Sequence, residues 1–357
     1  MTGFQSMFGF ESILGQEKPI RLLKTLLRNE TIPHALLFLG IEGVGKKTTA
    51  MATAMASNCM GHGDENLPKE KKIRANRSTI QKITTKRGIC GCCKSCSKIK
   101  SDNHPDIILV EPTGNFIRIN QIRNLCNTLT MKPYEARLRV VIISDAQAMN
   151  PAAGNALLKM LEEPPDRTVL ILTAVHTSDL LPTIVSRCQH IRFSPIPHNH
   201  IEALLVEKQG ASHDDAKIVA TMANGSISKA LSMMRHIGKI NWIQRRAWLL
   251  NSLESLSLMS IPSRLAFAEN LSKNKGALAD SLEVMKSWFR DLVVCKFHPA
   301  QIMNKDLREK IQQNSKKMAV ASLLSKIDDI QLAQKNIQAN TNLRLTLEVL
   351  IMRLAKV

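Results

Sequence analysis

The stretch at residues 35–46 decides the fold, and it reads Ala35-Leu36-Leu37-Phe38-Leu39 followed by Gly40-Ile41-Glu42-Gly43-Val44-Gly45-Lys46. The apolar run predicts a buried strand, and a helical pattern begins after the glycines. A Gly-rich loop between a strand and a helix lets backbone N–H groups surround phosphate, and its terminal lysine reaches the β- and γ-phosphates. The stretch therefore predicts a P-loop, with Gly40, Gly43, Gly45 and Lys46 as candidate nucleotide ligands.

The residue after the P-loop lysine departs from the usual pattern. A Ser or Thr normally stands there and its hydroxyl holds Mg²⁺, whereas this chain has Lys47 and places its hydroxyls at Thr48 and Thr49. Because each helical residue turns by roughly 100°, Thr48 reaches the magnesium position only after a change of register. Thr48 stays a candidate ligand for ATP with Mg²⁺, but we expect little or no ATP hydrolysis by this chain.

Further apolar runs at 106–110, 140–143 and 169–172 alternate with helical patterns. Continuous apolar strands of this kind predict a parallel sheet that is covered on both faces, and hence an α/β domain. Ser144 and Asp145 follow the third strand. Either Ser144 replaces a magnesium-binding acid and Asp145 occupies the catalytic position, or Asp145 is the one acid retained. In both interpretations Asp145 is a candidate catalytic residue. The motif then has one carboxylate, whereas metal-assisted hydrolysis uses two.

Four cysteines have the spacing of a metal site. Cys90, Cys93 and Cys96 form a C-x-x-C-x-x-C run, and Cys59 lies upstream on a predicted helix. Four thiolates converging on one ion form a structural Zn²⁺ site, and no nearby acid or base indicates a catalytic one. Cys92 is left out because it fits only by shortening a spacing. No secretory signal is visible, so metal binding is favoured over disulfides.

Composition narrows the function classes. The chain has 357 residues, and 49 Lys+Arg minus 30 Asp+Glu gives a net charge of +19, which favours a polyanionic partner. Phe 9, Trp 3 and Tyr 1 add up to 13 aromatic residues, too few to favour single-strand binding by base stacking. No apolar stretch approaches the ~18–20 residues of a membrane span, so we expect no membrane partner and a cytoplasmic location.

Composition shifts divide the chain into three predicted domains. An α/β domain covers residues 1–195 and contains a zinc module at 59–96, with a basic insertion at 62–87. That insertion carries 8 Lys+Arg against 3 Asp+Glu, a net +5, and is expected to be solvated. Closely spaced prolines at 195 and 197 mark the boundary. A small helical domain at 196–238 and an all-helical domain at 239–357 follow.

Several strings carry a resemblance to a known family. They are His34-Ala35-Leu36-Leu37, His104-Pro105-Asp106, Asn155-Ala156-Leu157-Leu158-Lys159, Leu161-Glu162-Glu163-Pro164-Pro165, Leu181-Pro182-Thr183-Ile184 and Ser186-Arg187-Cys188. Together with the P-loop and the cysteines, over roughly residues 10–235, they resemble the clamp-loader AAA+ subunits of bacterial DNA polymerase III. By this resemblance residues 196–238 are a lid, and residues 239–357 fit the family's oligomerisation collar by length and position.

The resemblance implies a role for Arg187. In this family the arginine of the Ser-Arg-Cys string projects toward the ATP of a neighbouring subunit, so Arg187 would be an arginine finger in trans. Subunits with active ATPase sites also carry a nucleotide-sensing arginine where this chain has Ser228; Lys229 is adjacent but faces elsewhere on the helix. Lys47, Ser144 and Ser228 together favour the delta-prime branch over gamma/tau.

Three functions are compatible with these residues. The favoured one is a delta-prime-like stator that completes a heteropentameric ring with gamma/tau-type and delta-type subunits, donates Arg187 and supports loading of the sliding clamp on primed DNA. The second is a gamma/tau-like motor that hydrolyses ATP with Lys46, Thr48 and Asp145. The third is an autonomous zinc-containing nucleic-acid-binding protein.

Overall fold

The structure is a computed structural model, and the residues that it describes are 9–61, 89–235, 242–273, 275–339 and 341–356. The chain divides into two compact units, residues 1–200 with 226–228, and residues 201–225 with 229–357. The basic insertion predicted at 62–87 lies outside the described residues. A division of the second unit into domains at 196–238 and 239–357 stays a prediction.

A parallel sheet forms the centre of the first unit. Within the described residues it has five strands in the order β2-β3-β4-β1-β5, and every pair is parallel. The strands are β1 Ala35–Leu39, β2 Ile107–Val110, β3 Arg139–Ile143, β4 Thr168–Ala174 and β5 Gln189–Arg192. The apolar runs predicted as strands form β1 to β4, so the parallel α/β fold expected for this part of the chain is confirmed.

Strand β5 was not predicted from the sequence, and its position explains why. It pairs with β1 alone, with Leu37 beside His190, and so lies at the edge of the sheet. Ile191 is its one buried residue among exposed polar neighbours. An edge strand with one side chain in the core lacks the continuous apolar run of a central parallel strand.

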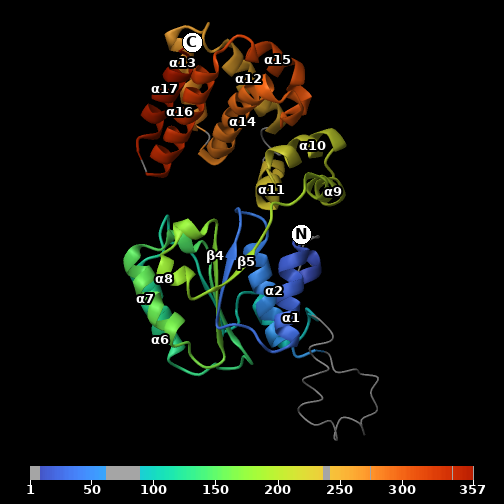
Figure 1. Cartoon of the computed structure of the whole chain (residues 1–357), viewed down its shortest axis with the longest axis vertical. Coiled ribbons are helices and arrows are strands. Elements are labelled where there is room, and N and C mark those ends of the chain that lie inside the picture. Colours follow the sequence, from blue (N-terminus) through green and yellow to red (C-terminus); the bar gives the residue numbers. More distant parts are fainter. Residues whose placement is uncertain (1–8, 62–88, 236–241, 274, 340, 357) are drawn as a thin grey trace, which may run out of the picture. The chain divides into compact units, whose positions relative to one another are not determined.

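Helices cover both faces of the sheet, with α6, α7 and α8 on one side and α1 and α2 on the other (Figure 1). Their bounds, with α5, are α1 Glu17–Arg28, α2 Lys46–Asn58, α5 Lys94–Lys100, α6 Ile119–Leu129, α7 Pro151–Glu162 and α8 Pro182–Val185. Leu37, Ile143 and Leu170 of the sheet pack into one core with Leu125 of α6 and Leu157 of α7. This burial of apolar surface fixes the strand ends from which the candidate site is built.

The second unit is helical throughout its described residues. Its helices are α9 His198–Gln209, α10 His213–Met222, α11 Ile227–Arg235, α12 Trp242–Ser255, α13 Ile261–Lys273, α14 Leu278–Phe297, α15 Arg308–Ser315, α16 Val320–Gln338 and α17 Leu343–Leu354. Helix α14 packs against α12, α15 and α16, and α17 packs against α13 and α16. The helical C-terminal region expected from the sequence is confirmed in the described residues. In the described parts of the chain, no helix is long and apolar enough to cross a membrane.

A buried polar network fixes the segment after α14. The Asp291 carboxylate is fully buried and accepts from the backbone N–H groups of Met303 (3.1 Å) and Asn304 (2.8 Å). The guanidinium of Arg246, also buried, reaches Asp306 Oδ2 at 2.6 Å and Asn304 Oδ1 at 2.8 Å. Buried charges remain tolerable when they are paired and hydrogen-bonded, as they are here.

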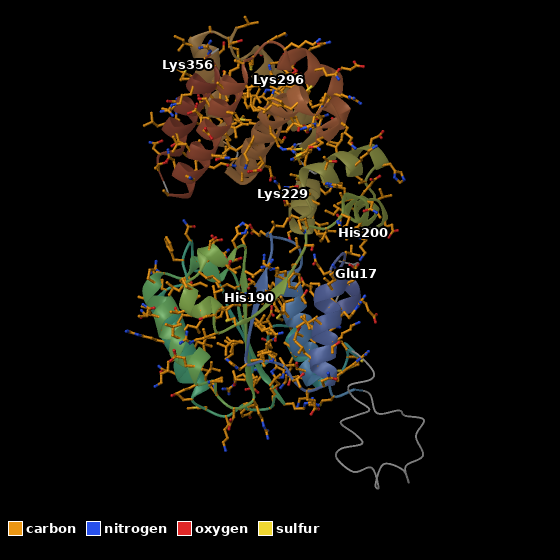
Figure 2. All side chains as sticks on the ribbon, viewed as in Figure 1. Glu17, His190, His200, Lys229, Lys296 and Lys356 are labelled. Carbon is orange, nitrogen blue, oxygen red and sulfur yellow. The ribbon has the colours of Figure 1, made fainter. Side chains whose placement is uncertain are left out.

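Most Lys and Arg side chains of the helical unit whose burial is described lie at its surface, and Arg246 and Lys326 are buried. Residues 233–357 carry 20 Lys+Arg against 10 Asp+Glu, a net +10. Lys296 in the last turn of α14 and Lys356 beyond α17 are exposed examples (Figure 2). A diffuse positive surface attracts polyanions without base-specific contacts.

Candidate functional site

The P-loop, residues 40–46, joins β1 to α2 and requires glycine at two positions. Gly43 has φ 77° and Gly45 has φ 97°, in the left-handed region that side chains disfavour. A Cβ at Gly43 would also lie 2.1 Å from Ser226 Oγ and 2.9 Å from Ser228 Cβ. The loop therefore has the backbone of a strand-to-helix turn that passes close to the segment 226–228.

That segment also bonds to the loop backbone. The N–H of Ile227 donates to the carbonyl of Gly43 at 3.0 Å, and the N–H of Ser228 approaches the same oxygen at 3.4 Å. Ser228 is the position at which the resemblance expects a nucleotide-sensing arginine. The structure thus brings this position against the P-loop, but with a short hydroxyl side chain in place of a guanidinium.

Lys46 is buried and bonded to its own loop. Its Nζ donates to the carbonyl oxygens of Gly40 and Ile41, the second at 2.9 Å. Burial lowers the pKa of Lys46, while the negative charges of Asp145 and Glu42 oppose this shift. The P-loop lysine is therefore held by main-chain oxygens and lies within the electrostatic reach of Asp145.

Lys47 stands where the magnesium-binding hydroxyl is usually found. Its Nζ forms an ion pair with Glu111 Oε1 at 2.6 Å, with both side chains about half exposed at 47% and 50%. Glu111 follows β2 directly, so this carboxylate lies at the edge formed by the strand ends. Thr48 is exposed, and Thr49 is buried with its hydroxyl donating to the carbonyl of Gly45 at 2.8 Å. No described contact brings Thr48 to the P-loop, so its role as a ligand stays a prediction.

The acidic motif after β3 is divided between two environments. Ser144 is buried, and its hydroxyl has no hydrogen-bond partner among the described residues. Asp145 has φ 53°, its N–H donates to Thr173 Oγ1 at 3.0 Å, and its Oδ1 accepts from Gln147 at 3.4 Å. Asp145 is thus the carboxylate of this motif whose charge acts on Lys46, while Ser144 supplies no charge for a cation.

Arg187 lies away from the P-loop, after α8. Its Nη2 forms an ion pair with Glu162 Oε1 at 2.6 Å, and its Nη1 donates to the carbonyl of Thr183 at 3.0 Å. The Arg187 side chain retains 36% of its exposure. Its chain neighbour Cys188 is buried in the core, and burial raises the pKa of this thiol to about 11. The segment is therefore anchored in the core by Cys188, while the preceding Arg187 is presented to solvent.

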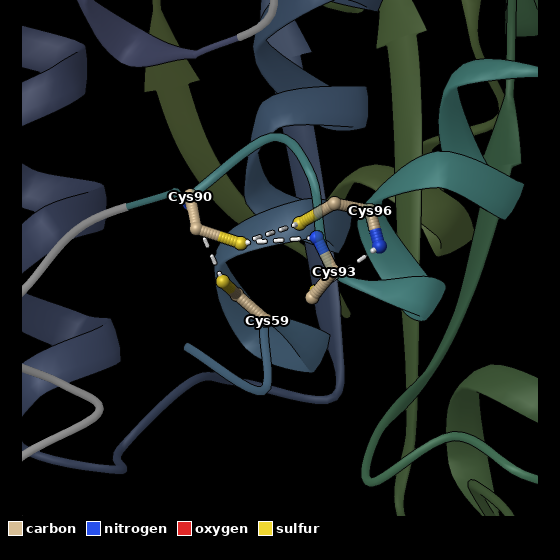
Figure 3. Close-up of side chains that lie close together, drawn as sticks. All are labelled: Cys59, Cys90, Cys93 and Cys96. Atoms are coloured by element: carbon tan, nitrogen blue, oxygen red, sulfur yellow. Dashed lines mark hydrogen bonds between the residues drawn. The ribbon is translucent and has the colours of Figure 1, made fainter. Parts of the chain in front are cut away.

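The four predicted metal ligands converge in space. The Sγ atoms of Cys59, Cys90, Cys93 and Cys96 all lie within 4.8 Å of one another (Figure 3). Four thiolates at ~2.3 Å from a tetrahedral zinc ion would lie about 3.8 Å apart, and the Cys90 and Cys96 sulfurs are 4.0 Å apart. The residues present therefore fit a structural zinc ion.

Backbone N–H groups point at three of these sulfurs. The N–H of Cys90 donates to Cys59 Sγ (3.4 Å), that of Cys93 to Cys90 Sγ (3.3 Å) and that of Cys96 to Cys93 Sγ (3.5 Å). Such bonds stabilise negative charge on sulfur, as a thiolate ligand requires. A hydrogen bond between the two thiols lowers the pKa of Cys59 and raises the pKa of Cys96. Cys59 ends α2 as its C-cap, one position past the helix on which it was predicted.

The remaining cysteines lie outside this cluster. Cys92 is exposed, and its Sγ donates to the Cys90 carbonyl, which agrees with leaving it out of the metal site. Cys188 and Cys295 are buried, and Cys126 packs against the main core. No disulfide joins any of the eight cysteines, all of which lie in the described residues.

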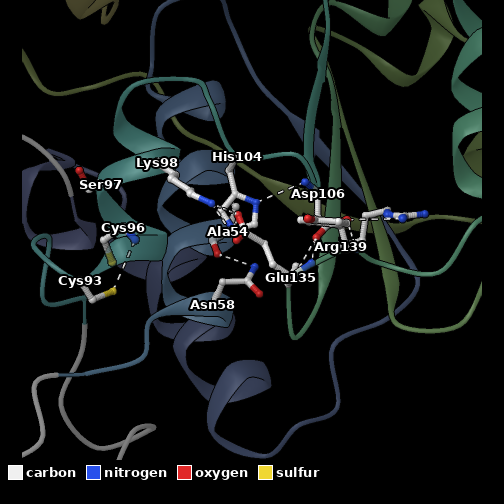
Figure 4. A network of polar contacts seen from close by, with 12 residues as sticks. Ala54, Asn58, Cys93, Cys96, Ser97, Lys98, His104, Asp106, Glu135 and Arg139 are labelled. Atoms are coloured by element: carbon white, nitrogen blue, oxygen red, sulfur yellow. Dashed lines mark hydrogen bonds and ion pairs between the residues drawn. The ribbon is translucent and has the colours of Figure 1, made fainter.

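A buried carboxylate, that of Asp106, holds the loop before β3. Asp106 accepts from the backbone N–H groups of Tyr134, Glu135 and Ala136, each at 2.8 Å, and from Arg139 Nη2 at 3.4 Å (Figure 4). Burial by itself raises the pKa of the Asp106 carboxyl, but these hydrogen bonds and the charge of Arg139 bring it below its usual value. The His-Pro-Asp string was noted as part of the resemblance, and its structural role was missed.

Asp106→Asn is expected to lower the free energy of unfolding by about 3 kcal/mol at pH 7, because an amide cannot replace the buried carboxylate and Arg139 would remain unpaired. The lowered pKa of Asp106 means that this contribution is present above pH ~4 and lost as the carboxylate is protonated at lower pH. Urea unfolding at pH 7 and pH 3 measures both.

The exposed Asp102, four residues earlier on the same connection, supplies the control. Asp102→Asn is expected to change stability by no more than about 0.5 kcal/mol, as is usual for surface substitutions. If Asp106→Asn lowered the free energy of unfolding equally at pH 7 and at pH 3, the role assigned to the buried carboxylate would be contradicted.

Comparison with known proteins places this architecture in a family. The family model for "DNA polymerase III, delta subunit" matches residues 15–85 and 71–197, and that for "DNA polymerase III, delta subunit, C terminal" matches residues 241–356. The chain therefore belongs to the DNA polymerase III delta-subunit family. The expected resemblance to clamp-loader subunits of bacterial DNA polymerase III, of the delta-prime type with gamma/tau relatives, is confirmed.

Two relatives found by sequence agree with this placement. The chain is 27% identical to DNA polymerase III subunit delta' of Bacillus subtilis, over 95% of this chain and 96% of the relative. It is 24% identical to the tau subunit of the same organism, over 97% of this chain but 61% of that longer protein. A solved gamma-subunit-related protein of Thermotoga maritima is 17% identical, with a TM-score of 0.44, over 93% of this chain and 98% of that one.

Sequence reasoning missed two acidic residues of the site, Glu111 and Glu162. Glu111 comes directly after a predicted strand, and the carboxyl ends of parallel strands meet at one edge of the sheet, where sites form. That rule could have placed Glu111 near the P-loop helix. Glu162 stands within a noted string, but its partner Arg187 is 25 residues away along the chain.

Proposed function

We propose that this chain is a delta-prime-like stator of the DNA polymerase III clamp loader, which completes the AAA+ ring and hydrolyses little or no ATP itself. The observation that carries the proposal is the ion pair between Lys47 and Glu111 at 2.6 Å. It puts an ammonium group where an active P-loop offers a hydroxyl to Mg²⁺, and the nearby carboxylate is already neutralised.

Two further observations support a site that lacks the parts for hydrolysis. Ser144 is a buried hydroxyl in place of a magnesium-binding acid, and Ser228 lies against the P-loop without the charge of a sensing arginine. Asp145 is then the one carboxylate of its motif, and its charge opposes the lowering of the Lys46 pKa. ATP binding through Gly40, Gly43, Gly45, Lys46 and Thr48 stays a separate prediction, and the proposed stator does not need it.

The proposed catalytic contribution of the chain is Arg187, an arginine finger toward the ATP of a neighbouring subunit. The guanidinium is planar, permanently charged and suited to phosphate oxygens. Its partial exposure at the end of α8 supports contact with another subunit. The chain would act on a neighbour's reaction while its own P-loop stays inactive.

The remaining parts of the proposal rest on family membership and charge. The partners are gamma/tau-type and delta-type subunits in a heteropentamer assembled through the C-terminal collar helices, together with the sliding clamp and primed DNA in the cytoplasm. The surface charge of the helical unit supports a place near DNA, because diffuse positive potential attracts phosphates without reading bases. The four cysteines would hold a structural Zn²⁺ beside the P-loop helix.

Lys46→Met is the substitution that separates a stator from a motor. It keeps the buried stem of the side chain and removes the charge that a nucleotide would need. We expect ATP turnover by the assembled loader, measured with clamp and primed DNA, to change by less than about twofold, since no transition state is stabilised at this site.

The motor alternative predicts the opposite result. It is favoured by the electrostatic interaction of Asp145 with Lys46. If the chain hydrolysed ATP, Lys46→Met would remove the contribution of its own site to loader turnover. Gel filtration and thermal melting of the variant exclude loss of assembly or folding as the cause. A large loss of turnover in a correctly assembled ring would reject the stator.

A further inference from the structure

The carboxyl end of helix α7 carries an acidic side chain in an electrostatically unfavourable place. Glu162 is the last residue of α7, and the partial negative charge at a helix C-terminus favours cations over carboxylates. The guanidinium of Arg187 lies against this carboxylate, with Nη2 at 2.6 Å from Oε1. The ion pair offsets the repulsion at the helix end, and at the same time it gives Arg187 a fixed partner.

The Arg187 side chain is held without being enclosed. Besides Glu162, it contacts the carbonyl of Thr183 at 3.0 Å and the hydroxyl of Ser186 at 3.5 Å, both through Nη1. These contacts use three of the five N–H donors of a guanidinium. Since the side chain keeps 36% of its exposure, the remaining donors are available to an anion from another molecule.

The two elements that carry this pair are packed closely together. Helices α7 and α8 lie on the same side of the sheet (Figure 1). A Cβ at Gly154 of α7 would lie 2.8 Å from Leu181 Cδ1, so the absence of a side chain there lets the helix approach the start of α8. Ile184 and Cys188, on either side of Arg187, are buried in the core. The Glu162 carboxylate therefore reaches Arg187 from a rigid base.

We propose that Glu162 is a positioning residue that orients Arg187 toward the phosphates of the neighbouring subunit's ATP. This inference rests on the proposed function of Arg187 as an arginine finger. A free arginine side chain samples many rotamers, and those that point away from the phosphates contribute nothing to catalysis. Contacts that hold the guanidinium by one edge reduce this loss and leave the other edge for the ligand.

Glu162→Ala in the fully assembled loader is the direct test. With clamp and primed DNA present, we expect kcat for ATP hydrolysis to fall about fivefold with little change in KM. A fall of this size corresponds to losing the whole contribution of an exposed ion pair in the transition state. Glu162→Gln keeps an oxygen for Arg187 Nη2, so we expect kcat within about twofold of the parent. Glu163→Ala, which removes the adjacent exposed carboxylate, is the matched control and should leave kcat unchanged.

The pair Glu162→Ala and Arg187→Ala distinguishes the possible failures. If Glu162 acts through Arg187, the double variant has the same kcat as Arg187→Ala alone. If Arg187→Ala leaves loader turnover unchanged, the proposed function fails. If Arg187→Ala lowers turnover but Glu162→Ala leaves it unchanged or raises it, or if Glu162→Gln is no better than Glu162→Ala, the positioning role is overturned and the arginine finger stands.

Discussion

Arg187→Ala is expected to lower ATP hydrolysis at the neighbouring nucleotide site, toward which Arg187 is proposed to point, by about 10³-fold, the lower end of the range for arginine fingers in phosphoryl transfer. The expected loss is large because a guanidinium that contacts the transferring phosphate stabilises the charge that develops in the transition state. The chain's own fold should be unaffected, since the Arg187 side chain is partly exposed and contributes one surface ion pair.

The measurement is ATP turnover by the assembled loader in the presence of clamp and primed DNA. Arg187→Lys keeps the positive charge but loses the planar fork, so we expect intermediate turnover. Arg123→Ala, which removes an exposed arginine on α6, controls for a general loss of surface charge. Equal turnover for Arg187→Ala and Arg123→Ala would remove Arg187 from the mechanism.

Cys93→Ser is expected to abolish zinc binding and to destabilise the α/β unit. At a free zinc concentration of about 100 times Kd, a metal bound to the folded state alone contributes about 2.7 kcal/mol. For a unit of this size, that loss lowers Tm by about 5–10 °C. Collar assembly should persist, because the cysteine cluster and the C-terminal helices belong to different compact units.

Substitution by serine separates the effect of losing the metal ligand from the effect of losing the helix cap. Cys93 is the N-cap of α5 and its side chain accepts from the N–H of Cys96, a task that serine also performs well. Cys92→Ser, at the exposed cysteine outside the cluster, is the matched control. Metal analysis and thermal melting with and without a chelator measure both variants. If Cys93→Ser retained zinc or melted with the Cys92→Ser protein, the four-cysteine site would be wrong.

The strands and the metal ligands were predictable because their signals are local. Strand β1 is a continuous apolar run, and the glycines after it fix a turn that few other residues can adopt. The short C-x-x-C spacings likewise bring Cys90, Cys93 and Cys96 together within one turn and one helix start. Strand β5 lacked such a signal, because a single buried side chain at a sheet edge is not a pattern.

The residues of the candidate site could be predicted from the sequence, but the partners that they contact could not. The departure at Lys47 could be read from the sequence, but its partner Glu111 is 64 residues away and was not foreseen. The same holds for Ser228, which lies against Gly43. Contacts between residues far apart along the chain depend on how strands and helices pack, and no periodicity in a single segment records them.

The sequence by itself determined the P-loop turn, the parallel α/β core and the cysteine set, because each follows from short-range spacing and burial of apolar residues, whereas Arg187 was singled out by the resemblance to clamp-loader subunits. The tertiary structure alone decided which partners these groups contact. It pairs Lys47 with Glu111 and Arg187 with Glu162 in ion pairs, and it brings Cys59 beside Cys90, 31 residues further along the chain. Only the packed core brings such partners within bonding distance, because charge and hydrogen-bond interactions are strong only at short range.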